Sequence, residues 1–182
     1  MPNNHACKNS FDKGITVGGI AGSYKSRESS AIREMLRQLA HRGPDGNGIV
    51  ELPESVLGQT RLAIVDPRYR QLPMGRNGTW IAFSGEIYNY RELRASELSS
   101  MQLRSNSDTE VLLELFRRDG PACVEKLDGM FAIAIMHGGE LFLARDPLGI
   151  QPLYIGWHND LVERNGLISS MFGGYKNQED GH

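Results

Sequence analysis

The stretch Ile15-Thr16-Val17-Gly18-Gly19-Ile20-Ala21-Gly22 decides the fold of this chain. Its apolar residues favour a buried strand, and its glycines allow another backbone or a ligand to approach closely. We therefore predict a first strand over residues 15–21, with the rest of the chain arranged around the start of that strand. Apart from the Thr16 hydroxyl, the stretch holds no side chain that could act as a nucleophile.

Composition limits the classes of protein to consider. The chain has 182 residues, 40% of them hydrophobic, which indicates one globular domain rather than a disordered chain. Its 20 basic and 22 acidic residues nearly cancel, so charge gives no reason to expect nucleic acid or a membrane as a partner. No apolar run is long enough to span a bilayer. Residues 1–8 lack the apolar core of a signal peptide, so we expect a cytoplasmic protein.

Residue spacing predicts the elements that follow the first strand. Apolar residues at helical spacing predict a helix over residues 32–40, with Ser29 or Ser30 as its cap. Residues 66–78 are polar and contain Pro and Gly, and we predict a loop there. Short apolar runs between turn residues predict further strands over residues 49–52, 56–65, 79–83, 130–137, 140–145 and 151–156.

Capping residues and a glycine pair mark the later helices and a hairpin. Asn89 followed by Glu92 resembles a helix N-terminus, and Ser107-Asp108-Thr109-Glu110 is a clearer capping box. The Gly138-Gly139 pair predicts a tight hairpin. Beyond Trp157 the strand pattern weakens.

These elements predict an α+β fold. Tight hairpins and short connections favour antiparallel pairing, and the amphipathic helices must cover apolar sheet faces. We therefore predict a four-layer αββα sandwich of two mostly antiparallel sheets with helices outside. The predicted domain covers residues 15–172, between a flexible extension at residues 1–14 and a polar tail at residues 173–182.

Four separated signals could carry chemistry. Arg61 is a charge within an apolar strand, Ser84-Gly85-Glu86 ends a strand, Asp108 opens a helix, and His41-Arg42-Gly43-Pro44-Asp45 forms a turn. An arginine fork can hold a carboxylate and an aspartate can hold an ammonium, so Arg61 and Asp108 together would clamp a free α-amino acid. Each signal also has a structural explanation: an ion pair for Arg61, a helix N-terminus for Asp108 and a bulge for Gly85.

Signals for other chemistry are missing from the sequence. No histidine stands at a metal-ligand spacing from cysteine or carboxylate residues. The glycine-rich first stretch is a poor match to a dinucleotide-binding motif, and there is no phosphate-binding loop with a Lys-Ser or Lys-Thr pair. The sequence therefore predicts neither a metal nor a cofactor.

Seven motifs, in order over residues 17–156, make the chain resemble the class II glutamine amidotransferase domain of the asparagine synthetase family. The resemblance implies the N-terminal-nucleophile (Ntn) hydrolase fold, in agreement with the layers predicted from spacing. The motifs are Gly19-Ile20-Ala21-Gly22, His41-Arg42-Gly43-Pro44-Asp45, Arg61-Leu62-Ala63-Ile64-Val65-Asp66, Gly85-Glu86-Ile87-Tyr88-Asn89, Ser107-Asp108-Thr109-Glu110, Asp128-Gly129-Met130-Phe131-Ala132 and Ala144-Arg145-Asp146-Pro147-Leu148-Gly149-Ile150.

The resemblance also implies roles for single residues. In such domains an N-terminal cysteine attacks the side-chain amide of glutamine and releases ammonia, with its own α-amine as base. By position, Arg61 would bind the glutamine carboxylate and Asp108 the α-ammonium. Glu86 would help to hold the α-amino end, and the backbone N–H of Gly85 would be one oxyanion donor.

Two departures from the family fall on the chemistry. Gly18 occupies the position of the nucleophilic cysteine, and the residues before it keep it from being the N-terminus. Ser84 occupies the position of an asparagine whose side chain is the second oxyanion donor. In a protease, loss of the nucleophile costs roughly 10⁶ in turnover. Loss of one oxyanion donor costs roughly 10²–10³. We therefore predict a degenerate domain without useful glutamine hydrolysis.

Other nucleophiles are the alternative. Cleavage after Ile15 would expose Thr16 as an N-terminal nucleophile, but Thr16 and Gly18 lie about 6.6 Å apart along a strand. Cys7 lies in the predicted extension, and we expect Cys123, next to an apolar helix, to be a core residue. The two cysteines are far apart in sequence, and we expect both to be free thiols.

A third departure concerns the second half of the family. Residues 161–171 match the family poorly, and no ATP-pyrophosphate loop of the Ser-Gly-Gly-x-Asp-Ser type is present. We therefore expect this chain alone not to make asparagine. Three hypotheses remain: a scaffolding subunit for a separate ATP-dependent synthetase-like protein or a second copy of itself; a domain that binds glutamine or a related amino acid; and an active amidotransferase with a non-standard nucleophile.

Overall fold

The computed structural model describes residues 18–62, 72–160 and 163–169, with side chains described as far as Gly156. The α-helices within these residues are α1 (Ser29–Gln38), α2 (Tyr90–Ser96) and α3 (Asp108–Asp119). Short 3₁₀ turns follow α1 (Leu39–Arg42) and α3 (Gly120–Lys126). The strands are β1 (Gly19–Tyr24), β2 (Gly46–Leu52), β3 (Ser55–Arg61), β4 (Met74–Arg76), β5 (Thr79–Ile87), β6 (Gly129–His137), β7 (Glu140–Arg145), β8 (Tyr154–Asp160) and β9 (Glu163–Ser169).

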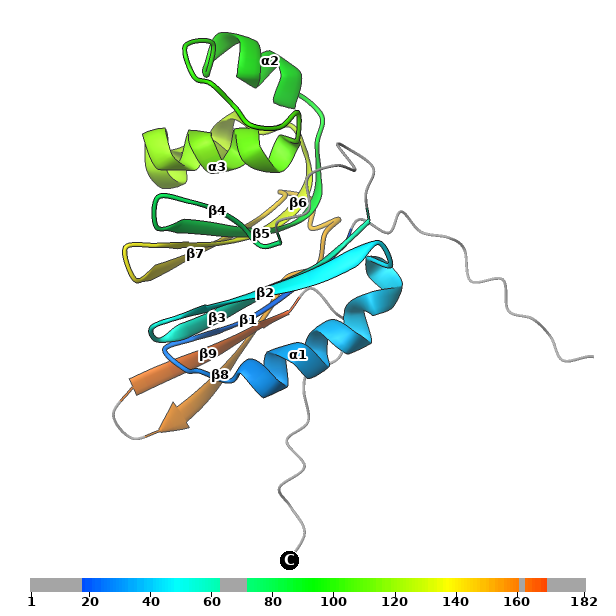
Figure 1. Cartoon of the computed structure of the whole chain (residues 1–182), viewed down its shortest axis with the longest axis vertical. Coiled ribbons are helices and arrows are strands. Elements are labelled where there is room, and N and C mark those ends of the chain that lie inside the picture. Colours follow the sequence, from blue (N-terminus) through cyan, green and yellow to red (C-terminus); the bar gives the residue numbers. More distant parts are fainter. Residues whose placement is uncertain (1–17, 63–71, 161–162, 170–182) are drawn as a thin grey trace, which may run out of the picture.

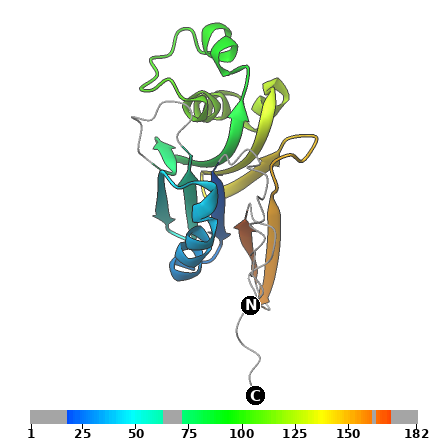
Figure 2. The same ribbon diagram turned by 90° about the vertical axis from the view of Figure 1, so that its right-hand side faces the viewer.

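The strands form two antiparallel sheets, in the orders β2-β3-β1-β9-β8 and β4-β5-β6-β7. Figure 1 shows the sheets stacked face to face, with α2 and α3 outside one sheet and α1 outside the other. Figure 2 shows the same layers from the side, with β2 and β8 at opposite edges of their sheet. The predicted αββα sandwich is confirmed.

Three apolar clusters fill the three interfaces between these layers. Side chains alternate between the faces of a strand, so β6 sends Ile133 and Ile135 toward α3 and Ala132 and Ala134 toward the other sheet. Small alanines on the inner face allow the two sheets to pack closely. The larger residues on the outer face of β6 pack against α3.

The start of α3 confirms the predicted cap. Ser107 Oγ accepts a hydrogen bond of 3.2 Å from Glu110 N. The predicted cap of α1 is wrong: Glu28 stands at the N-cap position and makes no side-chain cap bond, while Ser29 and Ser30 are already helical. Burial of the apolar face of α1, rather than capping, therefore holds this helix in place.

Several strand bounds differ from the predicted ones. The first strand continues beyond residue 21 to Tyr24, because Gly22 and Ser23 pair with β3 on one side and β9 on the other. The predicted loop over residues 66–78 contains β4, which pairs with β5. The β8–β9 hairpin was not predicted, because the sequence pattern after Trp157 is weak. Pairing with both β8 and β1 holds β9 in the sheet. The glycine pair before Glu140 forms the predicted hairpin turn.

Residues 1–17, 63–71, 161–162 and 170–182, on which the predicted extension and tail fall, lie outside the described part. Within that part, no helix combines the length and apolar character needed to cross a bilayer.

Candidate functional site

The predicted site residues gather where β5 ends and β1 begins. Ser84 lies on β5, and its hydroxyl is 3.1 Å from the carbonyl oxygen of Gly18. Gly18 precedes β1 and packs on the end of β3: a Cβ at this position would lie 2.7 Å from Thr60 O and 3.8 Å from Arg61 Cα. Gly18, Arg61 and Ser84 therefore come together although 66 residues separate Gly18 from Ser84.

Asp108 joins the same region from the N-terminus of α3. Its carboxylate accepts hydrogen bonds from Ile87 N at 3.2 Å and from Thr109 N at 2.7 Å, and only 6% of the residue is exposed. Burial raises the pKa of Asp108 to about 6; the two backbone N–H groups oppose this shift, and the negative charge of Glu86 adds to it. Asp108 is therefore a carboxylate at neutral pH that lacks a cation among these contacts.

Gly85 is required by the packing of β5 on β6. Its φ is 144°, and a Cβ there would lie 2.0 Å from Met130 O and 2.7 Å from Phe131 Cα. Both atoms belong to the backbone of the paired strand and cannot yield without breaking the ladder. A side chain at position 85 is therefore excluded, which keeps this part of the site free of side-chain atoms.

The predicted turn at residues 41–45, before β2, packs against the end of β3 and against Gly18. A Cβ on Gly43 would lie 2.3 Å from Arg61 N. Asp45 N donates a 3.0 Å hydrogen bond to Arg61 O. The Arg42 side chain reaches farther, since Nε donates to Gly18 O at 2.9 Å. The motif thus fixes the backbone of both Arg61 and Gly18.

Two residues at the site carried no role in the sequence-based prediction. Gln151 is 3% exposed, and its side-chain oxygen accepts hydrogen bonds from Arg42 Nη2 at 3.0 Å and Ser84 Oγ at 3.2 Å. Asp146 holds the backbone of Gln151 through a 2.9 Å hydrogen bond to its N–H. The two contacts of the Gln151 side-chain oxygen join residues more than 60 positions apart. The Asp-Pro-Leu-Gly-Ile motif before Gln151 was the only signal in the sequence that pointed to this loop.

Glu110 orders the loop that leads to Asp108. Its carboxylate accepts hydrogen bonds from Arg104 N at 2.9 Å, Ser105 N at 2.6 Å and Ser105 Oγ at 2.7 Å. The predicted capping box is therefore only half formed, because the Glu110 side chain binds this loop and Ser107 N donates to Ser105 Oγ instead.

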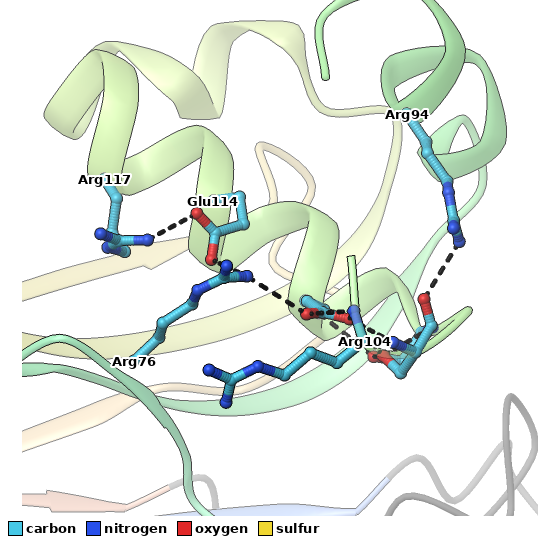
Figure 3. Close-up of polar contacts among 8 residues, drawn as sticks. Arg76, Arg94, Arg104, Glu114 and Arg117 are labelled. Atoms are coloured by element: carbon cyan, nitrogen blue, oxygen red, sulfur yellow. Dashed lines mark hydrogen bonds and ion pairs between the residues drawn. The ribbon is translucent and has the colours of Figure 1, made fainter. Parts of the chain in front are cut away.

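An ion-pair network fixes α3 on β4 (Figure 3). Arg76 Nη1 lies 3.0 Å from one oxygen of Glu114, and Arg117 Nη1 lies 2.7 Å from the other. Arg76 also lies 3.6 Å from Glu110. Two arginines thus compensate the buried charge of Glu114, which is 1% exposed. The network and Glu110 together set the position of the helix end that carries Asp108.

Cys123 lies in the core, as predicted, and has no exposed surface. Burial raises the pKa of its thiol to about 11, so it is a thiol rather than a thiolate at neutral pH. It packs in the cluster between α3 and its sheet.

The two-sheet sandwich is the fold of a known class of protein. A family model described as a glutamine amidotransferase domain matches residues 17–172, and the chain belongs to that family. The structure of the glutamine PRPP amidotransferase from B. subtilis has a similar fold, with a TM-score of 0.69 and 25% identity. That similarity covers 84% of this chain and 41% of the other.

Within the family, similar proteins include glutamine-hydrolysing asparagine synthetases. Asparagine synthetase 3 of Arabidopsis thaliana is 43% identical over 150 residues, which cover 80% of this chain and 26% of that protein. Asparagine synthetase 1 of Bacillus subtilis is 39% identical over 150 residues, which cover 78% of this chain and 24% of that protein. The chain thus spans about a quarter of the length of these relatives.

Proposed function

We propose that this chain is a degenerate amidotransferase domain that binds glutamine or a related amino acid without hydrolysing it. The observation that carries the proposal is the glycine at position 18. In this proposal Gly18 takes the position of the nucleophilic cysteine of the family, and it has no side-chain sulfur or oxygen that could attack an amide. The relatives' names give them glutamine hydrolysis, and this activity does not transfer to a chain that lacks the attacking atom.

The backbone at Gly18 supports the same conclusion. Its φ of 81° is a conformation that favours glycine, and a Cβ would lie 2.7 Å from the carbonyl oxygen of Thr60. In this conformation a cysteine side chain does not fit without a shift of β1 or β3. The described geometry at position 18 therefore favours glycine.

The amino-acid clamp supports binding. Asp108 offers a buried carboxylate for an ammonium group, and Arg61, whose Cα lies beside Gly18, carries a side chain long enough to extend from there toward the same head group. Glu86 stands beside Asp108 closely enough for its charge to raise the Asp108 pKa. In this proposal Arg61 binds the carboxylate of the amino acid, and Asp108 with Glu86 holds its ammonium.

A partner is the second part of the proposal. The apolar side chains of Leu148 and Ile150 stand in the loop that leads to Gln151 and are 85% and 55% exposed. We propose that a separate ATP-dependent synthetase-like protein, or a second copy of this chain, covers them. Co-purification tests this directly: the partner should be lost with Leu148→Ser and retained with a polar exchange at Tyr88, which is also exposed.

The alternative is an active amidotransferase with another nucleophile. Thr16 and Cys7 lie outside the described residues. Cys123 is buried and carries a raised pKa, which argues against it as the nucleophile. No observation on the described residues favours this alternative over the proposal.

Titration calorimetry with glutamine tests the binding proposal. We expect binding to the full chain and a loss of at least tenfold in affinity for Arg61→Ala, because a charge-assisted contact to the ligand carboxylate is removed. Arg91→Ala, at an exposed arginine on α2, is the matched control and should bind as the unchanged chain does. No heat with the unchanged chain would leave only the scaffolding role.

The pH dependence of binding tests the role of Asp108. Only the ionised form attracts an ammonium, and with a pKa of about 6 this form falls to roughly a tenth of the molecules at pH 5. The dissociation constant for glutamine should therefore rise about tenfold between pH 7.5 and pH 5. The same titrations with glutaramate, which lacks the ammonium, should show no such rise. A constant affinity for glutamine over this range would contradict the assigned role.

A further inference from the structure

Gln151 presents a buried carboxamide directly beside the proposed nucleophile position. Its oxygen lies 3.0 Å from Arg42 Nη2 and 3.2 Å from Ser84 Oγ. Both side chains also contact the carbonyl oxygen of Gly18, Arg42 through Nε and Ser84 through Oγ. Gln151, Arg42 and Ser84 therefore form one cluster around Gly18.

The orientation of this carboxamide follows from its partners. Arg42 carries only donors, so the group that faces it must be the oxygen of Gln151 and not the nitrogen. The nitrogen Nε2 must then point away from Arg42. Among the described residues Nε2 has no hydrogen-bond acceptor, whereas Oε1 accepts from both Arg42 and Ser84. Nε2 is thus a donor held in place by the contacts of Oε1, and no described residue accepts its hydrogens.

The Ser84 hydroxyl is a weaker candidate for the same task. It has a single hydrogen, and the described residues alone place two acceptors within reach, namely Gly18 O at 3.1 Å and Gln151 Oε1 at 3.2 Å. With either acceptor, the hydroxyl hydrogen is bound by a protein group rather than by a ligand. A carboxamide has two hydrogens on its nitrogen, and those of Gln151 are not taken by the described residues.

The spacing of the cluster from Asp108 suits an amino acid with a side-chain amide. Ser84 and Ile87, whose N–H binds Asp108, are three residues apart on β5, or about 10 Å. Two hydrogen bonds of about 2.9 Å and the body of a five-carbon amino acid fill such a span. The head of the ligand would then lie at Asp108 and its tail at Gln151.

We propose that the Nε2 group of Gln151 donates a hydrogen bond to the side-chain amide oxygen of the bound amino acid and so selects a ligand that has one. This inference rests on the proposed amino-acid-binding function. It adds a specificity-determining residue on the loop before β8 to the residues on β3, β5 and α3. Asp146 is its positioning residue, since it accepts from the backbone N–H groups of both Ile150 and Gln151.

The test compares L-glutamine with L-norvaline, which has the same head group and no amide. The unchanged chain should bind glutamine roughly 5- to 20-fold more tightly than norvaline, because one buried donor is left unpaired with norvaline. Gln151→Glu keeps an oxygen toward Arg42 but removes the donor, and Gln151→Met removes both groups at similar length. Each variant should bring the ratio of the two affinities close to one. Gln102→Met, at an exposed glutamine outside the cluster, is the control and should keep the ratio. Ser84→Ala tests the hydroxyl as the rival donor.

The outcomes separate this inference from the proposed function. Absence of binding of both ligands to the unchanged chain would overturn the amino-acid-binding function and the inference with it. Binding without a preference for glutamine, or a preference lost in Ser84→Ala and kept in both Gln151 variants, would overturn the inference alone. The side-chain amide signals of Gln151, identified by their loss in Gln151→Glu, should shift in ¹⁵N NMR spectra with glutamine and remain in place with norvaline.

Discussion

Gly85→Ala is expected to destabilise the protein by more than about 4 kcal/mol, a loss that only a few kinds of substitution produce. The new Cβ would lie 2.0 Å from Met130 O and 2.7 Å from Phe131 Cα, and the φ of 144° disfavours any side chain. Relief requires that β5 and β6 separate at the centre of their sheet. Because domains are stable by only about 5–15 kcal/mol, little folded protein should remain at elevated temperature.

Thermal and urea unfolding measure this loss. Gly46→Ala is the matched control, because Gly46 also lies in a strand and a Cβ there would meet no atom within 4 Å. It should change the free energy of unfolding by less than about 1 kcal/mol. Equal stability of the two variants would show that β5 and β6 are not packed as described at Gly85.

Asp146→Ala is expected to cost about 3–5 kcal/mol of stability. The Asp146 carboxylate is 2% exposed and accepts hydrogen bonds from the N–H groups of Phe131, Ile150 and Gln151 at 3.2, 2.9 and 2.9 Å. Alanine leaves these three donors without the carboxylate, and each unsatisfied buried donor costs about 1–3 kcal/mol. The loop that carries Gln151 should loosen, so glutamine binding should weaken as well.

The pH dependence of the free energy of unfolding of the unsubstituted protein gives an independent check on the role of Asp146. Burial alone would raise its pKa, but the N–H groups of Gln151, Ile150 and Phe131 together hold the pKa below its ordinary value. A lowered folded-state pKa means that ionised Asp146 stabilises the fold above pH 4 and that this contribution is lost as the pH falls. Asp128→Ala, at an exposed aspartate, should leave both stability and its acid dependence unchanged.

Local sequence patterns were sufficient for most of the fold. The apolar spacing in α3, the Ser107 cap and the glycine pair before β7 each act within a few residues, and each was predicted correctly. Elements that depend on distant partners were missed. Strand β4 is three residues long and exists because it pairs with β5, and β9 exists because β1 offers it an edge. Propensity cannot supply these pairings, since they depend on tertiary context.

The residues of the site also fall into those that local motifs predicted and those whose roles depend on distant contacts. Motif positions led to Arg61, Ser84, Gly85, Glu86 and Asp108, and the structure connects them through Gly18 and β5. The roles of Arg42 and Gln151 depend on a hydrogen bond between residues 109 positions apart. No local pattern encodes such a contact. A glutamine in a loop looks like any polar residue until the fold buries it beside Ser84.

Release of glutamate is the most direct test of the claim that this domain binds without hydrolysis. The purified full chain is incubated with isotopically labelled glutamine, and labelled glutamate and ammonia are measured against a buffer blank, together with the intact mass of the chain. We predict glutamate at the blank rate from a protein of full-length mass that still binds glutamine by calorimetry. Clear turnover above the blank, reduced by Arg61→Ala and not by Arg91→Ala, would contradict the account.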